Sequence, residues 1–584
     1  MNECWDLTPL YKGFDDPAFE GDMEALRRKV AQLNEFVGEL DNTEPLAGLK
    51  KGIALLEELV CLVDRLAAYP NLRQAVNTRD TEAGSQMGRF RGIYSGAAGA
   101  QAAFREWVCG LPDLKALVES DELLSQYSFY FENMTRSGRY MLGSTGEEIM
   151  ARMSMSGSNA WNAMRGLVTS TAKVAYRGGE TNLSHIRNLA RDPDATVRKD
   201  AYEAELRAYE DIKDPVAHAL NAIKLETISE CKLRGYASPL EYSLKNANVS
   251  RETLDAMFAA IDGYLPKFWQ YLKAKAKLLG HEGGLPWYDL LAPVGEAGGT
   301  YTTEQARDML LEVFGAFDGE MAEMMDTAFR EAWIDFYPRS GKRDGAFCSS
   351  VRSMGRSWIL TNFGGNLAAV GTLAHELGHA FHNRCIHSHR PLNKRYSMPL
   401  AETASTFNEC VIYSTVIDRA ATRQEKLALL DAQLRGETQI ICDIYSRFRF
   451  EDAIFAKREE KFLNADALCE LMLDAQKQCY GDGLDHGCLH PYMWICKPHY
   501  YSSTYYNYPY AFGGLFARGL HAQYVAEGAA FVPKYKKLLY TTTVANAEDV
   551  AKVAGIDLTD KAFWESALKS IADDIDLFCA LAEE

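Results

Sequence analysis

No uninterrupted apolar run of about 18 residues, the length that a helix needs to cross a bilayer, occurs in this sequence. The chain also begins without the basic and apolar segments of a secretory leader, since its first residues read Met-Asn-Glu-Cys-Trp. Its thirteen cysteines are odd in number and contain no C-x-x-C pair, which is typical of a reducing compartment rather than of a disulfide framework. We therefore expect a cytoplasmic protein without a membrane span.

Positive charge is in deficit, because 80 acidic residues outnumber 63 lysines and arginines and leave a net charge of −17. A surface of this sign repels phosphate backbones and anionic lipids, so we expect neither nucleic acid nor a membrane as a partner. Internal repeats and low-complexity segments are also absent. Apolar residues make up 47% of the chain, which is enough for a sizeable core. The oligomeric state is not indicated.

Apolar residues recur at helical spacing over most of the chain, for example through residues 19–40, 53–69 and 195–278. We expect the second of these helices to stop at Pro70. Residues 174–183 predict a short hairpin. The pattern therefore indicates a mainly α protein.

A soft boundary is expected near residue 190, where Asp-Pro-Asp breaks the helical pattern. This gives an N-terminal helical lobe over 1–190 and a catalytic lobe over 191–584. Within the first lobe, four glycines recur at every fourth position from Gly84 to Gly96. Because each glycine costs a helix about 1 kcal/mol relative to alanine, we expect this helix to pack closely against a neighbour.

The most specific motif is H-E-x-x-H, formed by His375, Glu376 and His379. Residues four apart lie on one face of a helix, so both imidazoles can reach a single metal ion. The carboxylate of Glu376 can reach a water on that metal without binding the metal itself. Two neutral nitrogen ligands suit Zn²⁺, and a catalytic zinc needs one further ligand and an open position.

The segment before the motif supports this interpretation. Residues 357–363 are rich in β-branched and aromatic side chains and predict a strand, Gly364 and Gly365 end it, and a helical pattern follows. A strand that leads into a helix with two histidines is the zincin arrangement. An extended substrate can pair with the edge of such a strand and lie across the metal.

The third ligand follows from the spacing after His379. The metzincin pattern requires Gly and His at the third and sixth positions, which hold His382 and Cys385. A thermolysin-like glutamate would fall near Pro399. The next candidate is Glu402.

Glu402 lies in an expected helix that has Ser397 as a plausible N-cap. Glu409 is seven residues further on and shares its face. The pair also fits a solvated acidic face, but the neighbouring residues make the helix look buried, and a buried carboxylate requires a cation. We predict that Glu402 completes the site with the two histidines, and that Glu409 orients one of those histidines.

His382 continues the face of His375. As a fourth protein ligand it would close the metal site and abolish catalysis. We therefore expect His382 to support the site from behind or to pack in the core.

An aromatic block holds six tyrosines and one histidine within residues 499–510. These tyrosines can simply be half-buried packing residues. Alternatively, phenol and imidazole groups can donate to the oxyanion of a tetrahedral intermediate during amide hydrolysis.

Five segments carry a resemblance to a known family. They are residues 5–11, 333–347, 375–382, 401–409 and 555–564. On these segments the chain resembles the thimet-oligopeptidase-like metallopeptidases, and within them the oligoendopeptidase F branch. The resemblance runs nearly from end to end.

The resemblance implies a two-lobed helical clamshell with a small β-sheet beside the metal-binding helix and a site deep in a channel. It also implies that residues of the aromatic block stabilise the oxyanion. By motif position these are His499 and Tyr508, with Tyr505 as the next candidate.

The predicted function is a zinc-dependent oligoendopeptidase, with one zinc per chain, that hydrolyses internal bonds of short unstructured peptides. A carboxypeptidase or dipeptidyl carboxypeptidase on the same scaffold is the alternative, and it requires a cation such as Arg352, Arg356 or Lys497 to anchor the free carboxylate. A peptide-binding protein without activity is a third possibility, and the intact H-E-x-x-H motif speaks against it.

Overall fold

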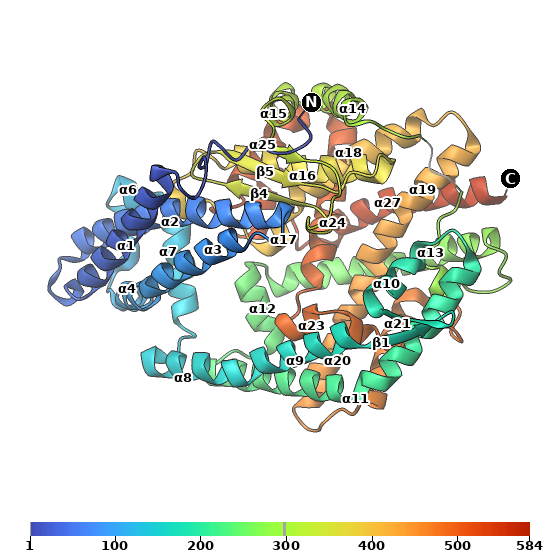
Figure 1. Ribbon diagram of the computed structural model, residues 1–584, viewed down its shortest axis with the longest axis horizontal. Helices are drawn as coiled ribbons and strands as arrows, with labels where there is room; N and C mark the ends of the chain where they lie inside the picture. The colour runs from blue at the N-terminus through green and yellow to red at the C-terminus, as the bar shows by residue number, and fades with distance from the viewer. Residues whose placement is uncertain (1, 296–298, 584) are drawn as a thin grey trace. The chain divides into compact units, whose positions relative to one another are not determined.

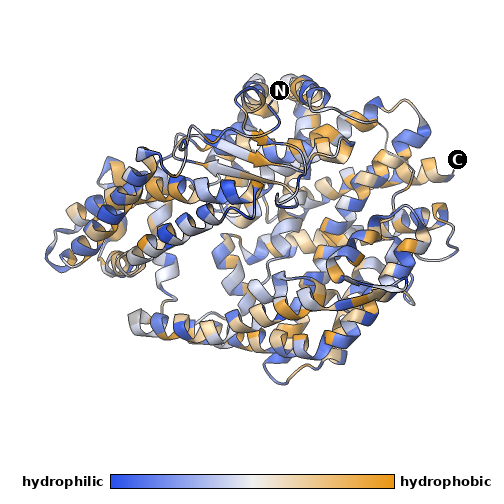
Figure 2. Cartoon of the chain, viewed as in Figure 1, coloured by the Kyte–Doolittle hydropathy of each residue, from blue (hydrophilic) through white to orange (hydrophobic). Residues whose placement is uncertain are grey.

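The computed structural model in Figure 1 describes residues 2–295 and 299–583. Helices dominate and strands are few and short, so the prediction of a mainly α fold is confirmed. Most helices carry both polar and apolar residues, as Figure 2 shows, because each buries one face and exposes the other. Within the described residues, no helix combines the length and the apolar character needed to pass through a bilayer.

The chain forms two compact units that are interleaved in sequence. Unit 1 comprises Met1–Met141, Gly299–Ile412 and Glu527–Gly555, and unit 2 comprises Leu142–Gly298, Tyr413–Ala526 and Ile556–Glu584. The boundary expected near residue 190 falls inside unit 2. The two expected lobes therefore do not coincide with the compact units, because the chain passes between the units several times.

Unit 1 contains helices and one small sheet. Its elements are α1 (Pro17–Val37), α2 (Pro45–Val76), α3 (Thr81–Tyr94), α4 (Ala98–Gly110), α5 (Leu114–Glu119), α6 (Glu122–Ser125), α7 (Ser128–Gly138), α14 (Thr303–Phe317), α15 (Gly319–Arg330), β3 (Ile334–Asp335), β4 (Phe347–Val351), β5 (Arg356–Leu360), α16 (Leu367–Cys385), α17 (Met398–Ala401), α25 (Phe531–Thr541) and α26 (Ala547–Lys552). Helix α18 (Thr403–Arg419) begins in unit 1 and ends in unit 2.

Among its described residues, unit 2 is helical apart from one hairpin. Its elements are α8 (Gly143–Ser156), α9 (Ser158–Thr171), β1 (Lys173–Tyr176), β2 (Gly179–Asn182), α10 (Leu183–Asn188), α11 (Ala195–Arg234), α12 (Pro239–Ala247), α13 (Arg251–Leu278), α19 (Arg423–Thr438), α20 (Ile444–Arg458), α21 (Ala465–Tyr480), α22 (Met493–Cys496), α23 (His499–Ser502), α24 (Tyr508–Glu527) and α27 (Lys561–Glu583).

The sheet of unit 1 has the strand order β3-β5-β4, with β3 parallel and β4 antiparallel to β5. The strand expected before the metal-binding helix is therefore present as β5. However, β5 is the central strand, so the prediction that a substrate pairs with its edge is wrong. Strand β4, which pairs with β5, has a free edge.

The core of unit 1 joins the N-terminal helices to this sheet. Val351, Trp358 and Leu360 are fully buried and belong to the same apolar cluster as the inner faces of α1 and α2. The indole N–H of Trp358 also donates to the carbonyl oxygen of Asp6 at 2.8 Å. The first residues of the chain thus hold the strand that leads into α16.

Two local predictions fail and one is confirmed. Helix α2 continues through Pro70 to Val76, because the apolar residues that follow Pro70 are buried and keep the helix in place. Gly88 and Gly92 have open space where a Cβ would lie, so the close packing expected for the glycine series is absent there. The hairpin is present as β1 and β2, whose turn places Arg177 and Gly178 at positive φ.

Candidate metal centre and active site

Helix α16 carries both histidines of the motif. It begins after Asn366, whose side chain caps the helix by accepting a hydrogen bond from the Ala369 amide at 2.9 Å. The rings of His375 and His379 have centroids 4.9 Å apart and are nearly perpendicular. The i, i+4 spacing therefore places two imidazoles side by side, as the sequence predicts.

Glu402 reaches the histidines because two helices approach one another unusually closely. It lies at the junction of α17 and α18. A Cβ on Gly378 would stand 2.6 Å from the carbonyl oxygen of Ala404 and 2.7 Å from the Cα of Ser405. Only glycine allows backbone to approach α16 at this distance.

The three expected ligands converge. Oε2 of Glu402 lies 3.2 Å from Nε2 of His375 and 3.4 Å from Nε2 of His379. One ligand atom from each residue lies within 4.8 Å of the other two, and no other group of this kind occurs in the part of the chain that the structure describes. Ser405 donates a hydrogen bond to Oε2 of Glu402 at 2.9 Å and helps to fix its orientation.

Glu409 stands behind one of these histidines. Its Oε1 lies 3.4 Å from Nδ1 of His375, on the far side of the ring from Glu402. An acceptor at Nδ1 favours the tautomer that leaves Nε2 free to bind a metal. This geometry agrees with the orienting role expected for Glu409.

Glu376 is buried beside the cluster, with only 5% of its surface exposed. Burial raises the pKa of its carboxyl, and His375 and His379 oppose that rise. Its Oε2 has no hydrogen-bond partner among the described residues. Glu376 therefore keeps an oxygen free to accept a proton.

The histidines and carboxylates of the cluster shift one another's pKa values. Burial tends to lower the pKa of His375, but the carboxylates of Glu402 and Glu409 outweigh it and raise the pKa. Burial tends to raise the pKa of Glu402, yet the two histidines hold it well below its usual range. Two imidazole nitrogens and a carboxylate oxygen, in an acidic surrounding, are a donor set that fits a divalent metal.

A cavity of about 310 Å³ opens over the cluster. The residues that line it and that sequence reasoning missed include Cys348, Asn383 and Tyr396. Only Asn383 could have been found by its position, since it lies four residues after His379 on the same helix. The other two come from β4 and from the loop before α17, and no spacing rule links those segments to the motif.

His382 is fully buried and takes no part in the cluster of ligand atoms. Its Nε2 lies 2.8 Å from the hydroxyl of Thr542, and its ring stacks on Tyr396 with centroids 4.3 Å apart. Burial lowers the pKa of His382 to about 3, so the ring is neutral. Its contacts are those of a residue that supports Tyr396 and the site from behind.

The predicted oxyanion donors lie in unit 2 and have different surroundings. The hydroxyl of Tyr505 donates to Asp452 at 2.7 Å. The hydroxyl of Tyr508 lies beside the side chain of Ser243 but makes no well-formed hydrogen bond among the described residues, and Tyr508 is buried at the start of α24. His499 stacks on Tyr506 with centroids 5.0 Å apart. The metal cluster belongs to unit 1, so the catalytic role of these residues stays a prediction.

Comparison with known families identifies the chain. The model described as "Peptidase family M3" matches residues 188–570, and the model described as "Oligopeptidase F" matches residues 112–173. The chain belongs to peptidase family M3. The junction between the two matches lies close to the boundary that we expect near residue 190.

Several curated proteins resemble the chain over nearly its whole length. Oligopeptidase PepF of Bacillus subtilis is 26% identical over 98% of this chain and 86% of its own length. Group B oligopeptidase PepB of Streptococcus agalactiae is 26% identical, over 97% of this chain and 94% of its own length.

Solved structures share the fold. A protein from Chlamydophila abortus matches with a TM-score of 0.85 at 20% identity, over 99% of this chain and 98% of its own. Oligoendopeptidase-F from Enterococcus faecium matches with a TM-score of 0.73 at 19% identity, over 97% and 99%.

Membership of peptidase family M3 makes this chain a metallopeptidase of the oligopeptidase kind, and it implies a bound metal and peptide substrates. The relatives named as oligopeptidases do not favour the carboxypeptidase alternative. Within the family, the cluster of two histidines and one glutamate is the part of this chain suited to hold the metal.

Proposed function

We propose that this chain is a zinc-dependent oligoendopeptidase that cuts internal bonds of short unstructured peptides. The observation that carries the proposal is the convergence of His375 and His379 on Glu402, with the buried carboxylate of Glu376 beside them. His375 Nε2, His379 Nε2 and Glu402 Oε2 hold one zinc per chain. When bound, zinc supplies Lewis-acid chemistry, polarising a water and the scissile carbonyl.

Glu376 moves the proton in this reaction. Its unpartnered Oε2 accepts a proton from the attacking water, and the same oxygen then gives that proton to the leaving amine. Burial raises the pKa of this carboxyl toward the operating pH, where a side chain can both accept and release a proton. Glu409 keeps the ring of His375 in place throughout.

The oxyanion donors are His499 and Tyr508, with Tyr505 as the next candidate. Resemblance to the family by motif position supports this assignment. The hydroxyl of Tyr508 has only a weak contact with Ser243, whereas that of Tyr505 donates to Asp452, and this difference favours Tyr508 as the donor. Hydroxyl groups that face developing negative charge stabilise the transition state more than the substrate.

The substrate lies extended along β4. This strand lines the metal cavity and has one free edge, whereas β5 has none. Main-chain hydrogen bonds to that edge recognise a peptide without regard to most of its side chains. The names of the relatives, which are oligopeptidases and oligoendopeptidases, support short peptides as the substrate class. We further propose a cytoplasmic location, and neither nucleic acid nor a membrane as a partner.

The proposal is tested by Glu376→Gln. The amide keeps the shape of the carboxylate but cannot accept the water's proton. We expect the variant to hold one zinc per chain, measured by elemental analysis, and to lose nearly all turnover of a fluorogenic octapeptide. Near-normal turnover in this variant would remove Glu376 from its role as the base. Loss of zinc would show instead that Glu376 is a ligand.

A further inference from the structure

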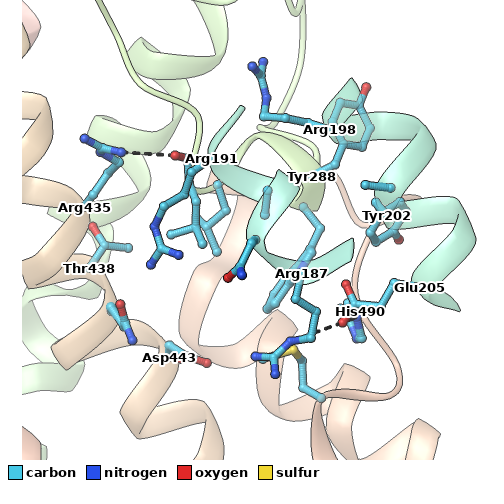
Figure 3. A pocket seen from close by; sticks show the side chains of 18 of the residues that line it. Arg187, Arg191, Arg198, Tyr202, Glu205, Tyr288, Arg435, Thr438, Asp443 and His490 are labelled. Atoms are coloured by element: carbon cyan, nitrogen blue, oxygen red, sulfur yellow. Dashed lines mark hydrogen bonds and ion pairs between the residues drawn. The ribbon is translucent and has the colours of Figure 1, made fainter. Parts of the chain in front are cut away.

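A second cavity, of about 260 Å³, lies entirely within unit 2 (Figure 3). Its walls are contributed by α10, the start of α11, the end of α19 and η6, a π-helical turn over Gln439–Asp443. The loop before α22 closes another side. None of the residues proposed for catalysis or for metal binding in the oligoendopeptidase lines this cavity, whereas Lys497, a carboxylate anchor in the alternative carboxypeptidase interpretation, does line it.

Positive charge gathers in this cavity although the chain as a whole carries −17. Arg187, Arg191, Arg435 and Lys497 all line it. Figure 3 shows the side chains of Arg187 and Arg191 extending toward the turn that carries Asp443. Burial and the neighbouring Arg435 and Arg187 lower the pKa of Arg191, so like charges surround this guanidinium.

The acidic residues nearby neutralise these cations only in part. Arg187 lies 3.5 Å from Glu205, but Arg191 makes no ion pair with any described residue. Arg435 lies 3.1 Å from Asp431, and that carboxylate is shared with the buried Lys275 at the same distance. The cavity therefore retains positive charge that a bound anion can balance.

Two buried hydroxyl groups in the same cavity are also without a partner. Thr438 and Tyr480 are 2% and 1% exposed, and neither side-chain oxygen makes a hydrogen bond within the described chain. A buried hydroxyl that is left unsatisfied costs about 1–3 kcal/mol, so such groups are normally paired. Thr438 immediately precedes the π-helical turn, a feature that is frequent at functional sites.

The size and the apolar surfaces of the cavity restrict the anion. Its volume corresponds to that of about eight or nine liquid waters. Trp287, Leu290 and Met493 give it apolar walls, which a bare inorganic ion cannot use. Glu205 and Asp443 also line the cavity and disfavour a dianion, since each adds a like charge. A monoanion with a small apolar body fits these conditions.

We propose that this cavity binds the carboxylate group of a small organic acid of about the size of a single amino acid. The guanidinium of Arg191 pairs with the carboxylate, because its planar fork matches the two oxygens. Thr438 and Tyr480 donate their hydroxyl hydrogens to the carboxylate or to a polar group beside it. The body of the ligand packs against Trp287 and Met493.

The experiment is calorimetric titration of the full chain with N-acetyl-L-leucine. N-acetyl-L-leucinamide has the same body without the carboxylate and serves as the matched probe, and chloride and inorganic phosphate test simple anions. We expect saturable binding of the acid and none of the amide. Arg191→Gln should weaken binding by about tenfold or more, and Thr438→Val by about threefold to tenfold.

Arg152→Gln is the matched control, because Arg152 is an exposed arginine of the same unit, paired with Glu148 on α8. This control should bind the acid as the unchanged chain does, and each variant should keep the unchanged chain's thermal unfolding midpoint. Unweakened binding in both Arg191→Gln and Thr438→Val would overturn the site. Equal binding of acid and amide would overturn the carboxylate. Tighter binding of chloride or phosphate, with displacement of the acid, would reassign the site to an inorganic anion.

Discussion

At the scale of single residues, the site depends on which polar atoms are already engaged. The carboxylate of Glu409 lies 3.4 Å from Nδ1 of His375, which favours Nε2 as the nitrogen that faces the metal site. Asp452 accepts a hydrogen bond from the hydroxyl of Tyr505, whereas the hydroxyl of Tyr508 has only a weak contact with Ser243. A catalytic donor must be free in the ground state and engaged in the transition state.

Tyr508→Phe is expected to lower kcat by about two to three powers of ten and to change KM little, because the lost hydrogen bond forms only with the oxyanion. Steady-state kinetics on an octapeptide measure both constants. Tyr505→Phe is the matched control and should lower kcat much less. If Tyr505→Phe showed the large decrease in kcat and Tyr508→Phe did not, the donor would be Tyr505, and our assignment of the donor by motif position would be wrong.

The sequence predicted His375, His379 and Glu402 because the helix repeat and the exclusion of other spacings leave few choices. It could not predict Tyr396 or Cys348, since they reach the site from segments with no fixed spacing to the motif. The sequence could not predict the cavity of unit 2 either. Its cations lie on separate elements, and only the fold brings them together.

At the scale of elements, the close approach of α16 and the start of α18 decides the geometry of the metal cluster. The sequence predicted α16, but it predicted a single helix from Ser397 through Glu402, where the structure has α17 and α18 separated at Glu402 and no capping hydrogen bond from Ser397. It also gave no indication that Gly378 is where the backbones of α16 and α18 meet. The glycine series from Gly84 to Gly96 suggested a close helix contact instead, although Gly88 and Gly92 face open space. Glycine spacing alone does not tell a close contact from an exposed helix face. The order of the sheet was missed for a similar reason, because strand neighbours are set by distant segments.

Gly378→Ala is expected to weaken metal binding by about tenfold or more, because the new methyl pushes the start of α18, and Glu402 with it, away from the histidines. Competition with a zinc chelator measures the affinity. The same variant should also unfold more easily, by about 1–3 kcal/mol of overpacking.

Gly88→Ala is its matched control, since a Cβ there meets nothing within 4 Å. This variant should keep full metal affinity and gain slightly in stability. Unchanged metal binding in Gly378→Ala would mean that the two helices can separate without moving Glu402.

Asp335 ties the sheet to two cations. Arg339 and Lys342 each lie 2.6 Å from its carboxylate, and the side chain of Lys342 is fully buried. Burial tends to raise the pKa of Asp335, but the hydrogen bonds from Arg339 and Lys342 outweigh it, so the pKa is lower than usual. Asp335→Asn should therefore destabilise the protein by about 3 kcal/mol at neutral pH, because it leaves a buried ammonium without its carboxylate.

The pH dependence of this loss follows from the sign of the shift. A carboxyl with a lowered pKa in the folded state stabilises the fold above its unfolded pKa of about 3.9, and this stabilisation disappears as the pH falls through the folded value. The difference between the two proteins should be constant from about pH 5 to pH 8 and should shrink below about pH 4. Urea unfolding measures it, with the exposed Asp344→Asn as control. A difference that grew on acidification would contradict the assignment.

At the scale of the whole molecule, the proposed activity requires an extended substrate. Pairing with the free edge of β4 needs several residues in strand conformation on both sides of the scissile bond. A folded protein supplies such a segment only by giving up much of its folding free energy, which is typically about 5–15 kcal/mol. The preference of the proposed enzyme for short peptides therefore follows from the extended conformation that pairing with β4 requires.

One decapeptide, offered as the free acid, as the C-terminal amide and within a stably folded domain, tests this selection. We expect internal cleavage of both peptide forms at similar rates and survival of the domain, as read by mass spectrometry. Cleavage of the free acid alone, near its end, would support a carboxypeptidase. Rapid cleavage of the domain would contradict recognition of an extended chain.

The interleaving of the two units has a consequence for biosynthesis. The first 141 residues belong to a unit whose last segment ends at Gly555, so about 400 residues must be made before that unit is complete. At roughly 5–20 residues per second, the delay is on the order of 20–80 s. The strand residues Val351, Trp358 and Leu360 cover the inner faces of α1 and α2 in the finished protein, and they are made roughly half-way through this delay. The nascent chain must keep these apolar faces from aggregating until those strand residues have been translated.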